Sequence, residues 1–341
     1  MRVAIVTDPQ SHSAGETIIA ESLQEAFAGQ ISPLETADVV ISTSRAAARN
    51  VTAPLGSPHI CYLADTNNAP QSHLMVQSPQ RLKPSTLELS AVSATPTETQ
   101  ATVSPGHQGI THYLAGNGIA ANQLRQAIDR PVKVISPAID TQPFRPQKLR
   151  RSEHYLLIID EGNISGLEVA IAASHIAGRE LVVVTEPNFE LPDLLAEQSH
   201  VQFVTADDDS DLYQYLCECR ALLCLSSGDF DANVIRAQAC GTPVIVPAGG
   251  GIEELILDAE QEGPGTGLLF EPSTPESIAS AMLEYERRPH KCSAMLASAH
   301  AQAFSPTRFA EEIHAFVEAV VNSTVRAVAD EPFGGEQRRA A

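Results

Sequence analysis

The chain has 341 residues, with 22 basic and 42 acidic side chains and a formal net charge of −20 at pH 7. This length is enough for two ordinary domains, and it excludes a small disulfide-stapled scaffold. Residues 1–150 hold 11 basic and 11 acidic residues, so the whole charge imbalance lies in residues 151–341. A field of this sign repels phosphate backbones, which argues against nucleic acid and anionic membrane surfaces as partners.

The cysteine content and the first residues indicate the compartment. Six cysteines are too few for a disulfide framework in a chain of this length, so we expect reduced, mostly buried thiols. The chain begins with a strand pattern and not with a signal peptide, because Asp8 and Pro9 interrupt the first apolar run. No apolar stretch reaches the length of a membrane span. We therefore expect a cytoplasmic protein without a transmembrane segment.

Apolar runs of strand length alternate with helix-length segments along the chain. In the first half we expect a helix over residues 18–27 and strands over 2–7, 38–42, 59–63 and 132–136. In the second half we expect strands over 155–159, 180–184, 201–204, 221–225 and 243–247. Helices are expected over 166–177, 190–198, 209–219, 231–239, 275–286 and 306–323. Continuous apolar strands separated by helices predict α/β domains with parallel sheets covered on both faces.

Two stretches interrupt this alternation. Residues 137–149 are rich in proline and would join two doubly wound domains as a hinge. Residues 66–107 are rich in Ser, Thr, Gln and Pro and have weak periodicity. They form either a long loop or a poorly ordered excursion.

Four motifs follow one another in the middle and second half of the chain. They read V-I-S-P-A-I-D-T followed by Phe144, then A-C-G-T-P-V-I at 239–245, G-G-I-E-E at 250–254 and G-L-L-F-E-P at 267–272. In this order and at these spacings, the set resembles the retaining glycosyltransferases of the GT-B fold, in particular the family 4 or group 1 type. The resemblance extends over residues 1–325.

This resemblance implies two Rossmann-like domains with doubly wound parallel sheets that face each other across a cleft. The acceptor-side domain would be residues 1–148 and the donor-side domain residues 149–305. A C-terminal helix over 306–325 would cross back to the first domain, and a disordered tail would follow over 326–341. The substrate implied is a nucleotide sugar, UDP- or GDP-linked, with a carbohydrate or glycolipid as acceptor; no cofactor and no metal are expected.

The resemblance also suggests site residues. The donor would be held by Ser226, Ser227, Arg236, Gly249, Gly250, Gly251, Glu254 and Glu161, and the acceptor side would include Ser13, Ala14, Gly15 and Asp65. A glycine-rich turn after a strand, opening a helix over 253–257, would aim backbone N–H groups at negative charge. The alternative is a tight turn that needs a positive φ and has no ligand.

The charge-handling positions depart from the family pattern. Glu161 stands where the family has an arginine, and Ser165 stands at or beside its lysine. Gly228 and Arg236 stand where it has two glutamates eight residues apart. Arg236 could bind a phosphate, but we favour a local ion pair with Asp160, Glu161, Asp229 or Asp231. The pattern is that of a degenerate homologue or of an enzyme with a changed donor.

Two further clusters could be taken for metal sites. The acidic run at 207–211 precedes a predicted helix, so we interpret it as a helix start and not as a metal site. Cys217 and Cys219 face different sides of a helix, and no clustered histidine completes a ligand set.

Two functions remain open. The chain transfers a sugar from a nucleotide-sugar donor to an acceptor with retention, or it is a catalytically degenerate homologue that acts as a partner subunit or ligand-binding protein. The fold alone does not decide between them.

Overall fold

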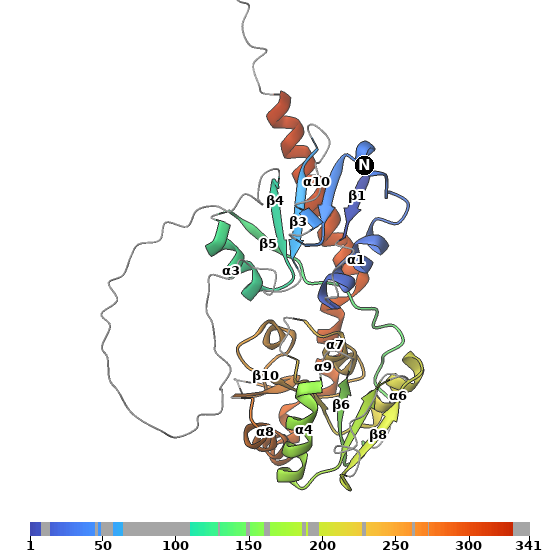
Figure 1. Cartoon of the computed structure of the whole chain (residues 1–341), viewed down its shortest axis with the longest axis vertical. Helices are drawn as coiled ribbons and strands as arrows, with labels where there is room; N and C mark the ends of the chain where they lie inside the picture. The colour runs from blue at the N-terminus through green and yellow to red at the C-terminus, as the bar shows by residue number, and fades with distance from the viewer. Residues whose placement is uncertain are drawn as a thin grey trace, which may run out of the picture.

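The computed structural model describes residues 1–7, 14–44, 47–48, 57–63, 110–128, 130–147, 151–159, 164–185, 189, 198–226, 230–260, 263–271 and 273–329. These residues form two α/β domains, each built on a parallel sheet, with one domain above the other in Figure 1. The predicted fold class is confirmed. The expected helix over 190–198 lies almost wholly outside the described residues.

The first sheet has five parallel strands in the order β1-β2-β3-β4-β5. They are β1 (Val3–Val6), β2 (Val39–Ser42), β3 (His59–Leu63), β4 (His112–Ala115) and β5 (Val132–Val134). The helical segments are α1 (Ala14–Ala26), η1 (Leu34–Thr36) and α3 (Gly118–Ile128). The strands are nearly continuous apolar runs because both faces of the sheet are covered.

The second sheet has six parallel strands in the order β11-β10-β9-β6-β7-β8. They are β6 (Tyr155–Ile159), β7 (Leu181–Thr185), β8 (Val201–Thr205), β9 (Leu222–Leu223), β10 (Val244–Pro247) and β11 (Gly267–Phe270). The chain builds outward from β6 through β7 to β8 and then returns to the other side of β6 with β9. The strand order therefore reverses between β6 and β9, which makes this the switch point of a doubly wound sheet.

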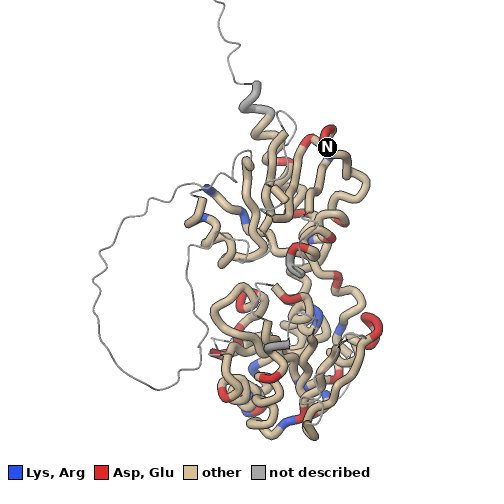
Figure 2. Tube along the Cα trace, in the orientation of Figure 1, with Lys and Arg blue, Asp and Glu red and all other residues tan. Residues whose placement is uncertain are grey.

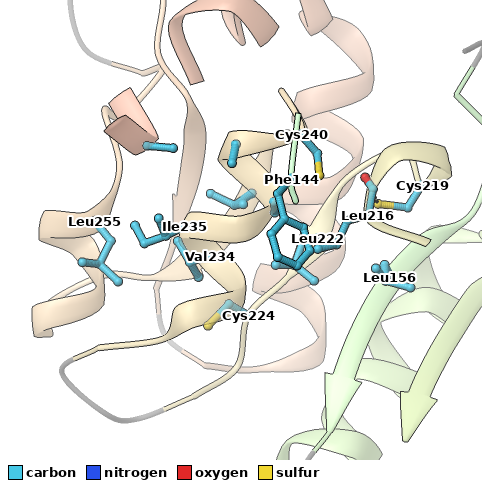
Figure 3. Close-up of a cluster of buried hydrophobic side chains, with 14 of the residues drawn as sticks. Phe144, Leu156, Leu216, Cys219, Leu222, Cys224, Val234, Ile235, Cys240 and Leu255 are labelled. Atoms are coloured by element: carbon cyan, nitrogen blue, oxygen red, sulfur yellow. Dashed lines mark hydrogen bonds between the residues drawn. The ribbon is translucent and has the colours of Figure 1, made fainter. Parts of the chain in front are cut away.

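Helices cover both faces of the second sheet. They are α4 (Ile164–Ala177), α6 (Asp209–Glu218), α7 (Ala232–Ala239), α8 (Pro275–Arg287) and α9 (Ala294–Ala301), with 3-10 segments η4 (Gly251–Leu255), η5 (Pro289–Lys291) and η6 (Gln302–Phe304). One core contains Leu156, Leu222 and Val234 together with Phe144 from the segment that joins the domains (Figure 3). The other core contains Leu157, Ile245 and Met282.

The long helix α10 (Pro306–Ala329) returns to the first domain, where it runs beside α1 (Figure 1). Phe309, Ile313, Val317 and Val320 are buried there at the helical spacing of one apolar stripe. The helix continues to Ala329, four residues past the boundary expected at 325, and residues 330–341 lie outside the described residues.

Local chemistry explains how α6 begins. The Asp208 carboxylate accepts hydrogen bonds from the backbone nitrogens of Ser210 and Asp211, at 2.8 and 3.0 Å. This is an N-cap arrangement, and further acids in the first turn face the positive end of the helix. The interpretation of residues 207–211 as a helix start is confirmed.

All six cysteines are free thiols, and five are buried, as predicted. No helix among the described residues is long and apolar enough to cross a membrane. Within the same ranges, no group of three His, Cys, Asp or Glu side chains is arranged to hold a metal ion.

Candidate functional site

The switch point of the second sheet brings two predicted site segments to one edge. Ser226 follows β9, and the turn over Gly249–Gly251 follows β10, the strand paired with β9. Carboxyl ends of parallel strands lie at the same edge of a sheet, and ligands of such folds bind outside that edge at the switch point. Glu161 and Ser227 lie outside the described residues.

The glycine turn owes its first glycine to backbone conformation. Gly249 has a φ of +84°, a region that side chains with a Cβ rarely adopt. A Cβ at Gly249 or Gly250 would meet nothing within 4 Å, so neither glycine is needed for close packing. Of the two interpretations of this turn, the positive-φ requirement is correct for Gly249.

The helix expected over 253–257 is absent. The turn opens instead into η4, a 3-10 segment of five residues, and Ile256 already has extended backbone with φ −127°. The chain leaves η4 because residues beyond it pair with the segment before β11, where Thr266 N donates to Leu257 O at 2.7 Å. A single 3-10 turn has little macrodipole, so the expected attraction from a helix N-terminus is lost.

The Glu253 side chain forms a hydrogen bond with the backbone of the glycine turn. Its Oε2 accepts a hydrogen bond from Gly249 N at 2.7 Å. The N–H that would face the negative charge of a ligand therefore already has an anionic partner. A phosphate that binds this N–H must displace the Glu253 carboxylate. The sequence interpretation missed this contact because Glu253 and Glu254 are equivalent side chains in the motif.

Glu254 reaches the other domain. Its carboxylate accepts hydrogen bonds from Gly118 N at 2.8 Å and Ile119 N at 2.9 Å, at the start of α3. Here the residue expected to bind the donor is hydrogen-bonded to the first domain. The start of α3 was not predicted, although Asn117 followed by an Ala- and Gln-rich segment is a signal for a helix N-cap.

Arg236 lies on α7 and packs against the segment that joins the domains. Its guanidinium carbon is 5.4 Å from the centroid of the Phe144 ring, and Nη1 lies 3.3 Å from Asn233 Oδ1. Nε is buried and has no hydrogen-bond partner. The structure records no ion pair between Arg236 and a described acid, and Asp160, Glu161 and Asp229 lie outside those residues.

Asp231, one of the acids considered for that pair, has other bonds. Its Oδ1 caps α7 by accepting from Asn233 N at 2.8 Å, and its Oδ2 accepts from the Cys224 thiol at 3.4 Å. Burial raises the pKa of the Cys224 thiol well above its usual value, with the nearby Asp231 as a second cause. The thiol therefore stays protonated and serves as a donor.

Most other described arginines in the second domain are bound by protein groups. In Figure 2 the Lys and Arg positions of the second domain alternate with Asp and Glu positions along the trace. Arg151 donates to Thr242 Oγ1 and to backbone carbonyls, and ion pairs engage Arg179, Arg220, Arg287 and Arg288. Among the described residues, the printed partners of the Arg236 guanidinium are the Phe144 ring face and the Asn233 amide.

Two of the four residues expected on the acceptor side lie at the start of α1. Ala14 and Gly15 form its first turn, whereas Ser13 and Asp65 lie outside the described residues. Next to them, Glu16 is buried and accepts a hydrogen bond from Thr43 Oγ1 at 2.6 Å. Thr43 also donates its N–H to Val6 O, so this pair marks the carboxyl end of β1.

A hollow of 480 Å³ lies elsewhere, on α9. It is lined by Pro146, Met295 and Gln302 with three small residues between them, and none of the predicted site residues lines it. The lining of this hollow is mostly apolar, and the hollow is not part of the candidate site.

Comparisons with known proteins agree with this architecture. Residues 160–287 match the model of a family described as glycosyl transferases group 1. Two curated relatives are named D-inositol 3-phosphate glycosyltransferase. The one from Kineococcus radiotolerans is 40% identical over 73 residues, which are 20% of this chain and 17% of the relative. The one from Frankia alni is 27% identical over 198 residues, 49% of this chain and 47% of the relative. The matches span less than half the length of either relative.

Solved structures share the whole fold. Anabaena HepE in complex with UDP superposes with a TM-score of 0.68 at 13% identity, covering 94% of this chain and 100% of HepE. Its complex with UDP-glucose has a TM-score of 0.67 at 14% identity, with the same coverage. The fold is therefore that of the GT-B glycosyltransferases, as predicted. The match to the glycosyl transferases group 1 family is confined to residues 160–287, whereas the likeness in fold extends over nearly the whole chain.

Proposed function

We propose that this protein binds a uridine diphosphate sugar at the carboxyl edge of its second sheet and transfers the sugar, with retention, to a polyhydroxylated acceptor. The observation that carries the proposal is the placement of Ser226 and the turn over Gly249–Gly251 at adjacent strand ends beside the switch point. The likeness to HepE, whose structures contain UDP and UDP-glucose, supports uridine as the nucleotide. The names of the two curated relatives make inositol phosphate the first acceptor to try.

Arg236 is our candidate for the cation that the diphosphate needs. A nucleoside diphosphate gains negative charge as it leaves the sugar, so a fixed positive group beside it lowers the barrier. The Phe144 ring contacts the Arg236 guanidinium by a cation–π interaction. The Nε of Arg236 is buried and has no hydrogen-bond partner. A guanidinium offers a fork of donors that matches phosphate oxygens.

The test is thermal unfolding in the presence of UDP, GDP or ADP. A ligand at 100 times its Kd stabilises the folded state by about 2.7 kcal/mol, which raises Tm by several degrees. UDP should raise Tm more than GDP or ADP, and Arg236→Ala should lose most of this shift. Arg287→Ala is the matched control, because Arg287 is largely exposed and its ion pair is with Glu284 of the same helix. An unchanged shift in Arg236→Ala would exclude Arg236 from the donor site, and no shift with any nucleotide would contradict the proposal.

A second candidate function is ligand binding without transfer. The observation that favours it is the bond from Gly249 N to Glu253, because an enzyme must displace its own carboxylate to use this N–H. Hydrolysis and transfer assays with UDP-glucose, with and without inositol phosphate, separate the two functions. UDP release that depends on the acceptor supports the transferase. UDP binding without release supports the degenerate homologue.

Glu253→Gln tests the glycine turn itself. Removing the negative charge should tighten UDP binding severalfold if the turn accepts a phosphate, because like charges then no longer oppose each other. An equal change in Glu254→Gln would show that the effect comes from net charge and not from the bond to Gly249.

A further inference from the structure

The start of α3 is completed by a residue from the other domain. The first four N–H groups of a helix have no partner within it. Asn117 Oδ1 accepts from Ala120 N at 2.7 Å, and Asn117 O accepts from Ala121 N at 3.1 Å. The two remaining donors, Gly118 N and Ile119 N, bind Glu254 Oε2 and Oε1, 136 and 135 positions away. This helix end is therefore fully satisfied while the domains are together.

The same contact explains why residue 118, at the start of α3, is a glycine. Gly118 opens α3, where most other residues would favour the helix more strongly. A Cβ built at Gly118 would lie 3.1 and 3.2 Å from the Glu254 oxygens, closer than ordinary packing allows. The glycine therefore leaves the space that the carboxylate of the other domain occupies.

The adjacent glutamate has a different partner. Glu253 binds Gly249 N within its own domain, while Glu254 crosses to the first domain. Both carboxylates belong to the single short segment η4, which follows the glycine turn directly. Glu254 therefore joins α3 to the same short segment that supplies the hydrogen-bond partner of Gly249 N.

We infer that Glu254 is a reversible latch between the two domains, holding the carboxyl edge of the second sheet against α3 and tying the glycine turn to domain closure. Glu254 is exposed, so water can replace both of its hydrogen bonds when the domains separate. A two-pronged, charge-assisted bond to backbone N–H groups favours the closed arrangement by holding the carboxylate at the positive end of a helix. The inference does not depend on which ligand the protein binds.

The experiment uses the full chain and compares Glu254→Ala with Glu253→Ala by small-angle X-ray scattering. Both variants lose one carboxylate from the same segment, but only the first loses the contact between domains. Glu254→Ala should have a larger radius of gyration than wild type, and Glu253→Ala should match wild type. A Glu254→Ala curve that overlays wild type, with circular dichroism showing a folded protein, overturns the latch.

Hydrogen exchange adds a local measurement. In Glu254→Ala the amides of Gly118 and Ile119 should exchange about tenfold faster or more, the factor that corresponds to roughly 1.4 kcal/mol of lost protection. Gly118→Val changes the α3 side of the contact and keeps the glutamate at position 254. It should open the domains in the same way, so it decides the question even if Glu254→Ala fails to fold. Unchanged scattering from a folded Gly118→Val overturns the inference.

Discussion

Arg179 and Glu286 form a two-pronged ion pair, with Nε and Nη2 at 2.7 and 2.6 Å from Oε1 and Oε2. The pair joins the start of β7 to the last turn of α8. Arg220 Nη1 lies 3.4 Å from the same carboxylate, and the Tyr155 hydroxyl lies 3.1 Å from it. The Glu286 side chain is only 14% exposed. The hydrogen bond from Arg179 is the main cause that holds the pKa of Glu286 below its ordinary value.

Glu286→Gln should therefore lower the free energy of unfolding by about 1–3 kcal/mol, because it removes the negative charge that Arg179 and Arg220 share. Its folded-state pKa is lowered, so this contribution is present above the unfolded carboxyl pKa of about 4.3 and is lost as the pH falls through the folded value. Urea unfolding at pH 7 and at progressively lower pH measures both effects. Glu153→Gln is the control, because Glu153 also binds Arg220 but is 82% exposed; it should cost no more than about 0.5 kcal/mol. Equal losses in the two variants would contradict this account.

Four histidines predict a second pH dependence nearer neutrality. Burial lowers the pKa of His59, His112, His154 and His300. The unfolded chain, with ordinary histidine pKa values of about 6.5, then binds protons that the folded protein does not. The free energy of unfolding should fall as the pH drops below about 6.5 and stay level above it. Urea titrations between pH 8 and 5 measure this slope, and His59→Asn should reduce it because His59 is fully buried beside Ser42. A slope that is the same in wild type and His59→Asn would argue against a role for this histidine.

The sheets could be predicted because their strands are apolar on both faces. Runs such as residues 155–159 and 181–184 have no polar face, which is typical of a parallel sheet covered by helices on both sides. β4 and α3 were missed. They follow a long stretch of weak periodicity, and His112–Ala115 is short with a polar first residue. Small residues such as Ala120 and Ala121 bury one face of α3 without an obvious apolar stripe.

The places of the candidate site segments in the fold could be predicted from the sequence, but their contacts could not. The motifs located the glycine turn and Ser226, because the positions of strand ends follow from the order of strands. They could not distinguish Glu253 from Glu254, since the direction of each side chain depends on η4 being a 3-10 segment. The partner of Glu254 lies 136 positions away, and no local pattern encodes such a tertiary contact.

Two glycines should respond differently to alanine. A Cβ at Gly267 would lie 2.3 Å from Val244 O, in the backbone of the neighbouring strand β10. Gly267→Ala must therefore push β11 and β10 apart and should abolish a cooperative fold or leave the protein insoluble. Gly249→Ala meets no neighbour and carries only the cost of a positive φ, about 1–2 kcal/mol. Soluble yield and urea unfolding compare the two. A Gly267→Ala protein as stable as Gly249→Ala would contradict the close approach of β11 to β10 at Gly267.

The packing of α10 on the first domain should be strongly stabilising at Phe309. Its ring is almost fully buried and stacks on Tyr62, with centroids 6.4 Å apart, while the Tyr62 hydroxyl donates to Ile135 O. Phe309→Ala leaves a cavity in this core and should lower the free energy of unfolding by about 3–5 kcal/mol. Phe316→Ala is the matched control on the same helix, because Phe316 is half-buried at the edge of this core, where its ring contacts His112 edge-on. Its loss should be distinctly smaller, since less apolar surface returns to water. Urea unfolding of both variants at one pH measures the difference. Equal losses in the free energy of unfolding would contradict the packing of α10 described here.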